Sequence, residues 1–363
     1  MPIGRNVSYV CRHKKRGIIY RTFAMSNILT KIKESFSLSN KGVRMIAMSP
    51  FYALSLLPYS VLYLLSDCIY IIIYHIVGYR KDVVRSNMSK SFPEKSEQER
   101  REIEREFYKW LSDYFVETLK MLSVSDKTFL KHVSFEGVEE LEKCFDKGQH
   151  CAAMLGHYGN WELLSATDLA FSEWGSHAIQ RNRNGERKPV VCGLIYHPLH
   201  NKFFDLLFIE IRQALRGICI PKKDILRKLV EYRREGRMTL FGYIADQSPK
   251  WNNIHLWLNF LGHETPVFTG AERIIRKMNN AVFYVDAERP RRGRYVFTFK
   301  PITLEPSKME PNEVTCRYFE MLEESIRRDP TIYLWSHDRW KRTREEYEHL
   351  FKVENGRTIP IEK

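Results

Sequence analysis

The stretch CAAMLGHYGNWE (residues 151–162) decides the fold class of this chain. Its first five residues form an uninterrupted apolar run, which is typical of a buried strand. Two glycines and an asparagine follow, and they favour a turn from that strand into a helix. We expect this helix to begin after Asn160, with Asn160 as its N-cap.

The same stretch places a histidine and a carboxylate, His157 and Glu162, five positions apart. Five positions of one regular helix rotate by about 500°, so the two side chains would not face the same way from a single helix. We therefore place His157 on the loop and Glu162 in the first helical turn, where it gains from the helix dipole and can reach back to the imidazole. A carboxylate that fixes the tautomer of a histidine suits a general base near neutral pH. The alternative is an ordinary surface or core pair, but the crowded glycines let a backbone or ligand approach closely and favour the base.

Further strand and helix patterns alternate along the chain. Expected strands are 133–137, 150–155, 190–196, 238–245, 281–286 and 295–300, and expected helices are 138–147, 161–171, 200–216, 224–235, 269–278 and 313–328. This alternation predicts an α/β fold with a mostly parallel central sheet flanked by helices. Because ligands bind at the carboxyl ends of such strands, three residues that follow strand ends could converge there: His157, His197 and Asp246.

The basic charge of the chain is concentrated before residue 45. The net charge is +14, and ten lysines and arginines against the single carboxylate Glu34 contribute +9 of it in that segment. A basic balance suits nucleic acid, an anionic membrane surface or an anionic substrate. Seven cysteines without a C-x-x-C pair indicate a reducing compartment and no structural zinc.

The next segment favours the membrane among these partners. Residues 45–77 are apolar, with Asp67 as their one certain charge, and Tyr59 to Val77 alone is 19 residues, about enough to cross a hydrocarbon core. Pro50 and Pro58 predict a short first helix or a kink before the main one. The alternative is a buried pair of core helices, which Asp67 and His75 would suit. Length and flanking charge favour a membrane-inserted or deeply membrane-embedded anchor.

Six ordered blocks resemble the late acyltransferases of bacterial lipid A biosynthesis (the lauroyl and myristoyl type), within the lysophospholipid acyltransferase superfamily and its H-x4-D/E motif. The blocks are GHYGNWE (156–162), IYHPLHN (195–201), the helix of Arg212 leading to IPKKD (220–224), ADQSP (245–249), PVFTGAERI (266–274) and YLWSHDRWK (333–341). The resemblance implies a membrane enzyme of the inner membrane of a Gram-negative bacterium, with its catalytic domain facing the cytoplasm. It implies acyl-ACP or acyl-CoA as co-substrate, with acyl carrier protein the commoner donor. No metal and no further cofactor are implied.

The resulting hypothesis is an O-acyltransferase that moves an acyl chain from a thioester to a hydroxyl of a lipid A precursor. His157 would be the general base and Glu162 its orienting carboxylate, and backbone N–H groups of residues 158–160 are candidate oxyanion donors. The candidate substrate-binding residues are Tyr158, Gly159, Asn160, Tyr196, His197, Asn201, Arg212, Asp246 and Gln247. The alternative acceptor is a lysophospholipid or an aminolipid.

Several of these residues have a second interpretation. His197 stands where the family usually has an arginine, so it either contacts phosphate when protonated or is a turn residue before Pro198. Arg212 either binds acceptor phosphate or pairs with a nearby carboxylate. Asp246 and Gln247 either bind substrate or tie loops together by hydrogen bonds. Arg339 and Lys341 are expected at a solvated or phosphate-facing edge.

The expected organisation has five parts: a basic arm that is either disordered or not translated (1–44), the membrane anchor (45–79), a helical segment packed on the catalytic domain (80–130), the acyltransferase domain (131–350) and a tail (351–363). Expected partners are acyl carrier protein, a phosphorylated glycolipid and membrane lipids. A nucleic-acid-binding protein is not favoured, because the cations lie beside the apolar segment rather than among aromatics on one face.

Overall fold

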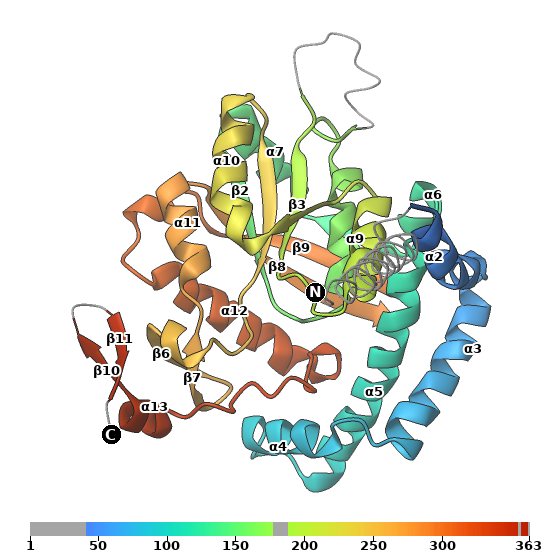
Figure 1. Cartoon of the computed structure of the whole chain (residues 1–363), viewed down its shortest axis with the longest axis horizontal. Coiled ribbons are helices and arrows are strands. Elements are labelled where there is room, and N and C mark those ends of the chain that lie inside the picture. The colour runs from blue at the N-terminus through green and yellow to red at the C-terminus, as the bar shows by residue number, and fades with distance from the viewer. Residues whose placement is uncertain (1–40, 177–187, 355–356, 362–363) are drawn as a thin grey trace, which may run out of the picture.

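A computed structural model describes residues 41–176, 188–354 and 357–361 of the chain (Figure 1). The expectations for residues 1–40 of the basic arm lie outside the described residues. A seven-stranded sheet forms the centre, in the order β1-β9-β8-β2-β5-β3-β4. Its strands are β1 (Val133–Glu136), β2 (Cys151–Leu155), β3 (Val191–Tyr196), β4 (Ile218–Pro221), β5 (Thr239–Ile244), β8 (Ala281–Arg291) and β9 (Arg294–Thr303).

The pairing in this sheet is parallel, except that β8 and β9 form an antiparallel hairpin. The predicted α/β class with a mostly parallel sheet is therefore confirmed. Strand β4 and the separate hairpin of β6 (Leu256–Phe260) and β7 (His263–Val267) were not predicted. A further hairpin, β10 (Phe351–Glu354) with β11 (Arg357–Pro360), lies in the predicted tail.

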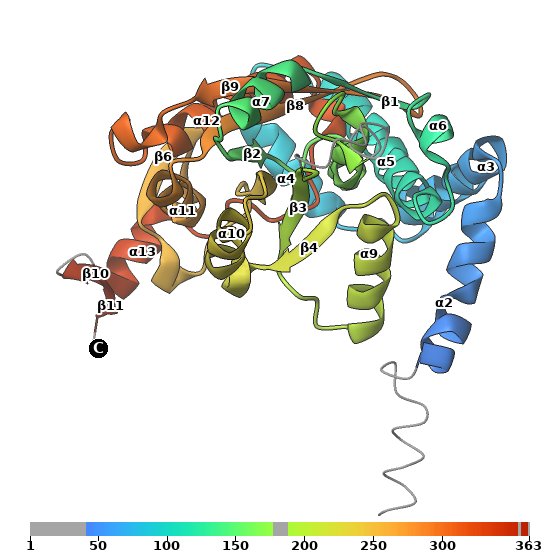
Figure 2. The same cartoon turned by 90° about the horizontal axis from the view of Figure 1, so that it is seen from above.

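Helices cover the sheet (Figures 1 and 2). They include α7 (Val138–Asp146), α9 (Lys202–Ala214), α10 (Ile225–Arg234), α11 (Gly270–Met278), α12 (Glu313–Arg328) and α13 (Arg344–Leu350). Helix α12 packs on β2, β8 and β9. The expected helix 161–171 is instead a run of 3-10 turns, η2 (Trp161–Ala170), which packs on β1 and β3. Short 3-10 segments also occur at η3 (Lys222–Asp224), η4 (Trp251–Asn253), η5 (Pro306–Lys308) and η6 (Pro330–Ile332).

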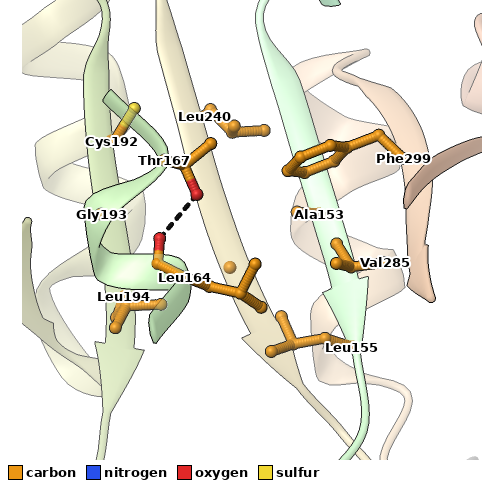
Figure 3. A pocket seen from close by; sticks show the side chains of 11 residues that line it. Ala153, Leu155, Leu164, Thr167, Cys192, Gly193, Leu194, Leu240, Val285 and Phe299 are labelled. Atoms are coloured by element: carbon orange, nitrogen blue, oxygen red, sulfur yellow. Dashed lines mark hydrogen bonds between the residues drawn. The ribbon is translucent and has the colours of Figure 1, made fainter. Parts of the chain in front are cut away.

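The face of the sheet under η2 is apolar (Figure 3). Side chains from β2, β3, β5, β8 and β9 surround a cavity of about 20 Å³ beneath Leu164 and Thr167. Thr167 donates its hydroxyl to the carbonyl of Leu164 at 2.6 Å, so its polar atom is satisfied within η2. A cavity of this size holds about one water molecule, so it does not accommodate an acyl chain in this state.

The N-terminal region consists of α2 (Lys41–Leu56), α3 (Tyr59–Tyr70), the π-helical continuation η1 (Ile71–Ile76), α4 (Lys81–Ser91), α5 (Glu97–Lys120) and α6 (Asp126–Phe129). The chain breaks at Pro58 between α2 and α3, as predicted, and Pro50 lies inside α2. Among the described residues, one helix, Tyr59–Ile76, is long and apolar enough to cross a membrane by length and composition.

Helix α5 joins this region to the sheet. It begins with a capping box between Ser96 and Glu99, which satisfies the free N–H groups of its first turn. Trp110 and Tyr114 on this helix are buried. Both rings contact Trp161 of η2, so α5 packs against η2.

One buried histidine at the start of β2 makes the fold sensitive to acid. His150 is 4% exposed and its Nδ1 lies 2.9 Å from the hydroxyl of Thr239. Burial, with a smaller effect of Arg233, lowers the pKa of His150 to about 4. Between pH 6.5 and 4 the unfolded chain therefore binds a proton at this position that the folded chain does not, and stability falls as the pH falls.

We predict that replacing His150 with glutamine makes the free energy of unfolding less dependent on pH between 6.5 and 4. Glutamine can keep a hydrogen bond to Thr239 but does not titrate. Chemical denaturation of both proteins at several pH values measures the difference. An unchanged pH slope in the variant would contradict the role of His150.

Candidate active site

The predicted site lies at the carboxyl ends of two neighbouring strands. Strands β2 and β5 are parallel and in register, with Leu155 opposite Ile244. His157 and Asp246 each lie two residues beyond these paired strand ends. Of the three residues expected to converge, His157 and Asp246 meet, whereas the hydrogen-bond contact of His197 is with the carbonyl of Pro198.

Asp246 is the carboxylate that contacts His157. Its Oδ1 lies 2.6 Å from Nδ1 of the imidazole, and its Oδ2 accepts the backbone N–H of His157 at 3.0 Å. The Asp246 side chain is 2% exposed, while that of His157 is 15% exposed. Burial alone would raise the pKa of Asp246, but the charge and hydrogen bonds of His157 outweigh burial and leave it below its ordinary value. An ionised carboxylate thus holds His157 at two points, one on the imidazole and one on its backbone N–H.

The other imidazole nitrogen is turned to a polar neighbour. Nε2 of His157 lies 3.0 Å from the amide nitrogen of Gln247, which donates to it. With Nδ1–H directed at Asp246, Nε2 carries the lone pair that a base needs. The edge of Trp161 packs against the ring, with centroids 4.8 Å apart and planes at 74°. These contacts fix both the tautomer and the orientation of the histidine.

The expected contact between Glu162 and His157 is wrong. Glu162 is 2% exposed and forms a two-point ion pair with Arg212 of α9, at 2.6 Å to Nε and 2.8 Å to Nη2. It also accepts hydrogen bonds from Nε1 of Trp161 and from the hydroxyl of Tyr114. The physical reason is that a buried carboxylate is stabilised most by a buried cation, and α9 packs on η2 and supplies one. Of the two interpretations of Arg212, pairing with a carboxylate is the one observed.

Asn160 is a buried link to α5 rather than a helix cap. It occupies the N-cap position of η2 as expected, but its side chain makes no capping bond. Its amide instead donates to Oε2 of Glu117 at 3.1 Å, and Tyr295 donates to the same oxygen at 2.9 Å. Burial raises the pKa of Glu117. Glu117 was missed from the sequence, because its spacing from the motif carries no local signal.

Gly159 is required by backbone geometry and packing. Its φ of +64° lies in the left-handed region, and a Cβ there would lie 2.8 Å from Cβ of Ala287. Its N–H donates to the carbonyl of Ile332 at 2.9 Å, so it is not an oxyanion donor in this state. The neighbouring Tyr158 is buried and donates its hydroxyl to the carbonyl of Ser325 at 2.7 Å. Gly159 was expected to let a ligand approach. In the structure, the space beside its Cα is filled by Ala287 of β8 instead.

The residues of the second block lie apart from the imidazole. His197 is exposed, and its Nδ1 lies 3.0 Å from the carbonyl of Pro198, as a turn residue would. Asn201 caps α9 by accepting the N–H groups of Phe203 and Phe204. The ring of Tyr196 lies 6.0 Å from the guanidinium of Arg212. Structurally, this block positions α9 and thereby Arg212.

The last block contributes two residues that were not predicted as part of the interior. His337 accepts the N–H of Ser248 at its Nε2, at 3.3 Å, and burial lowers its pKa to about 4. Arg339 is 1% exposed and donates to the carbonyl of Pro266 at 2.8 Å. Its charge acts on Asp246. The expected solvated edge is therefore wrong for Arg339, whose positive charge lies near a buried carboxylate, whereas Lys341 is exposed.

In the described ranges, no group of three or more His, Cys, Asp and Glu side chains could hold a metal ion. The expectation that the reaction needs no cofactor stays a prediction.

A mostly parallel α/β sheet thus carries, just past its strand ends, a buried aspartate bonded to a partly exposed histidine, and this arrangement is typical of acid–base sites. Residues 29–342 match the model of the bacterial lipid A biosynthesis acyltransferase family, so the chain belongs to this family and is a transferase enzyme. The family is associated with membranes. A search of curated proteins finds no match to the chain.

The two carboxylates near the site should respond differently to neutral amide substitutions. Asp246→Asn leaves the packing in place but removes the charge that orients His157, so we expect acyl transfer to fall by about 10³-fold or more. Glu162→Gln leaves Arg212 without its partner in a buried position, which we expect to cost about 3–5 kcal/mol of stability. Steady-state rates and denaturant unfolding, measured on both variants, separate the two effects.

The opposite pattern would contradict this assignment. If Glu162→Gln lost activity at unchanged stability while Asp246→Asn remained active, Glu162 rather than Asp246 would orient the base.

Proposed function

We propose that this enzyme transfers a fatty acyl chain from an acyl thioester to a hydroxyl of a lipid A precursor, with His157 as the general base. The observation that carries the proposal is the 2.6 Å contact between Nδ1 of His157 and buried Asp246, which leaves Nε2 as the ring nitrogen that the carboxylate does not occupy. The family match supports acyl transfer as the reaction.

In the proposed step, the acceptor hydroxyl takes the place of the Gln247 amide at Nε2 of His157. Nε2 removes the hydroxyl proton as the oxygen attacks the thioester carbonyl carbon. The tetrahedral intermediate then collapses, the C–S bond breaks, and the departing thiolate takes the proton back from the imidazolium. Asp246 stabilises the transient positive charge through Nδ1–H. The histidine ends in its starting state and no acyl-enzyme is needed.

Charge and anchoring support the expected substrates and location. A chain with a net charge of +14 favours an acidic donor protein, such as acyl carrier protein, and a phosphorylated acceptor. The apolar helix Tyr59–Ile76 supports a membrane location, and we place it at the inner membrane of a Gram-negative bacterium, with the site open to the cytoplasm. Glu162 and Arg212 act in this proposal as a positioning pair that fixes η2 against α9.

We predict that His157→Ala lowers acyl transfer by at least about 10²-fold, because general-base catalysis contributes that much or more. The assay uses purified membranes, an acyl carrier protein donor and a phosphorylated glucosamine lipid. His255→Ala is the matched control, because His255 is exposed, and this variant should keep its activity.

Full activity in His157→Ala would overturn the mechanism. Mass spectrometry of total lipids, with and without the gene, identifies the acceptor and the acyl chain. If the acyl chain is instead gained by a lysophospholipid or an aminolipid, the proposed acceptor is wrong. The role of His157 is tested separately, by the activity of His157→Ala.

A further inference from the structure

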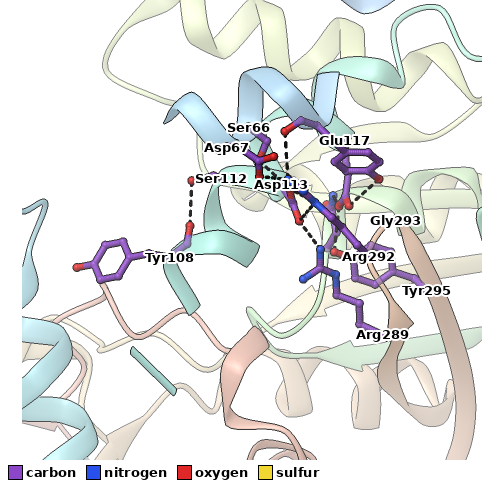
Figure 4. Close-up of polar contacts among 12 residues, drawn as sticks. Ser66, Asp67, Tyr108, Ser112, Asp113, Glu117, Arg289, Arg292, Gly293 and Tyr295 are labelled. Atoms are coloured by element: carbon purple, nitrogen blue, oxygen red, sulfur yellow. Dashed lines mark hydrogen bonds and ion pairs between the residues drawn. The ribbon is translucent and has the colours of Figure 1, made fainter. Parts of the chain in front are cut away.

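The apolar helix formed by α3 and η1 has two unlike faces. One face lies against α5 and the tip of the β8–β9 hairpin and is rich in polar contacts (Figure 4). The other carries exposed apolar side chains. These two faces help to decide how the helix lies in a bilayer. A helix that crosses a bilayer has its midpoint among the lipid tails, on every face.

The polar face is held by a buried aspartate of α5. The side chain of Asp113 is 2% exposed and accepts the hydroxyl of Ser66, from α3, at 2.6 Å. It also accepts Nη2 of Arg292 at 2.6 Å and a further hydrogen bond from Arg289, both from the hairpin. Since removing one partner from such a buried network leaves an uncompensated charge, this contact resists separation.

Contacts between the helix and α5 continue toward both ends. Before α3, Nζ of Lys120 donates to the carbonyls of Ser55 and Leu57 at 2.8 and 3.0 Å. At the far end, the ring of Tyr74 packs on that of Tyr108 with centroids 5.1 Å apart. The α5 residues in these contacts, from 108 to 120, cover about 18 Å of helix. The two helices therefore lie side by side, as Figure 1 shows, and α3 cannot enter a bilayer lengthwise without α5.

The outward face forms one stripe at helical spacing. It includes five exposed side chains at this spacing, Val61, Leu65, Cys68, Ile72 and Ile76, and the exposed Leu64 and Ile71 lie next to Leu65 and Ile72 in the sequence. The segment has a mean hydropathy of 1.5, yet only 11% of it is buried in the protein. An exposed apolar stripe of this length marks an interaction surface, and a continuous line of aliphatic side chains fits the acyl region of a lipid leaflet.

An exposed ion pair lies halfway along this helix. Asp67 and Arg292 are 2.7 Å apart, and their side chains are 55% and 40% exposed. If the helix crossed the bilayer, this pair would lie at the midplane, where a charged side chain costs about 2.5–3.5 kcal/mol or more. If the helix lies parallel to the membrane, the pair stays at the level of the headgroups.

We propose that α3 and η1 form a monotopic anchor that lies in the plane of one leaflet, with the stripe in the lipid and the Asp113 network facing the protein. Arg80 and Lys81 follow the helix and add positive charge at its end, where Arg80 also donates to the carbonyl of Ser336 at 2.7 Å and Nζ of Lys81 lies 3.9 Å from the centre of the Tyr74 ring. Such charge beside an apolar helix favours anionic headgroups. In this arrangement both ends of the helix lie on the same side of the membrane as the catalytic domain. The lipid substrate then reaches the site without leaving that leaflet.

The depth of the stripe tests this topology. A fluorescent label is placed in turn at Val61, Leu65, Cys68, Ile72 and Ile76 of the full chain. Cys11, Cys219 and Cys316 are replaced by serine, and so is Cys68 except where it carries the label, while Cys144, Cys151 and Cys192 are buried. The enzyme is reconstituted in anionic phospholipid vesicles that carry a quencher either near the headgroup or deep in the acyl chain. An in-plane helix predicts the same ratio of shallow to deep quenching at all five positions.

A spanning helix predicts a different profile, with deep quenching greatest at Cys68 and shallow quenching at Val61 and Ile76, and this result would overturn the proposal. Lack of quenching at all five positions would overturn it as well. Leu350 of α13, which is 39% exposed, is the matched control and should not be quenched. The measurement uses no substrate, so its failure is distinguishable from a failure of the proposed acyl transfer.

Discussion

The hydrogen bond between His157 and Asp246 is the interaction on which the site depends. It exists because β2 and β5 are adjacent, parallel and in register, so that the residues two positions past each strand end meet. Neither residue alone would indicate a site, because a partly exposed histidine and a buried aspartate each occur in many proteins without a catalytic role. Together they give an imidazole of fixed tautomer, as the proposed base requires, and the burial of Asp246 keeps water from weakening the contact.

The remaining buried carboxylates of the motif region hold the loop in place around this pair. Glu162 is tied to Arg212 of α9, and Glu117 of α5 is tied to Asn160. The loop that carries His157 is therefore fixed from two sides by elements distant in sequence. Unpaired, each of these carboxylates would be costly to bury. The same helix α5 also carries Asp113, so α5 contacts both the apolar helix α3 and the loop of His157.

Local patterns in the sequence predicted most of the fold. Continuous apolar runs such as residues 151–155 identified central strands, and a helical segment was expected over residues 80–130, where the structure has α4, α5 and α6. These signals work because each depends on one strand or helix alone. The order of strands in the sheet is a tertiary property, and without it the choice between Glu162 and Asp246 as partner of His157 could not be made correctly. Proximity in sequence favoured Glu162, whereas strand adjacency selects Asp246.

Arg339 and Glu117 are two further residues whose surroundings the local sequence did not predict. A charged residue in a polar stretch such as SHDRWK predicts a solvated side chain, yet Arg339 is buried because the segment passes under β7 and beside Asp246. Glu117 lies on an otherwise amphipathic helix, and only the fold reveals that its face meets Asn160 and Tyr295. The short strands β6 and β7 are set by pairing with each other rather than by a strong local pattern.

The most direct test of the central claim is nitrogen-15 NMR of the histidine side chains in the detergent-solubilised enzyme. The account predicts a His157 resonance with the proton on Nδ1 and a downfield shift from its bond to Asp246. This signature should be lost in Asp246→Asn and retained in Glu162→Gln. Retention in Asp246→Asn together with loss in Glu162→Gln would contradict the account, because it would show that the imidazole is oriented by Glu162.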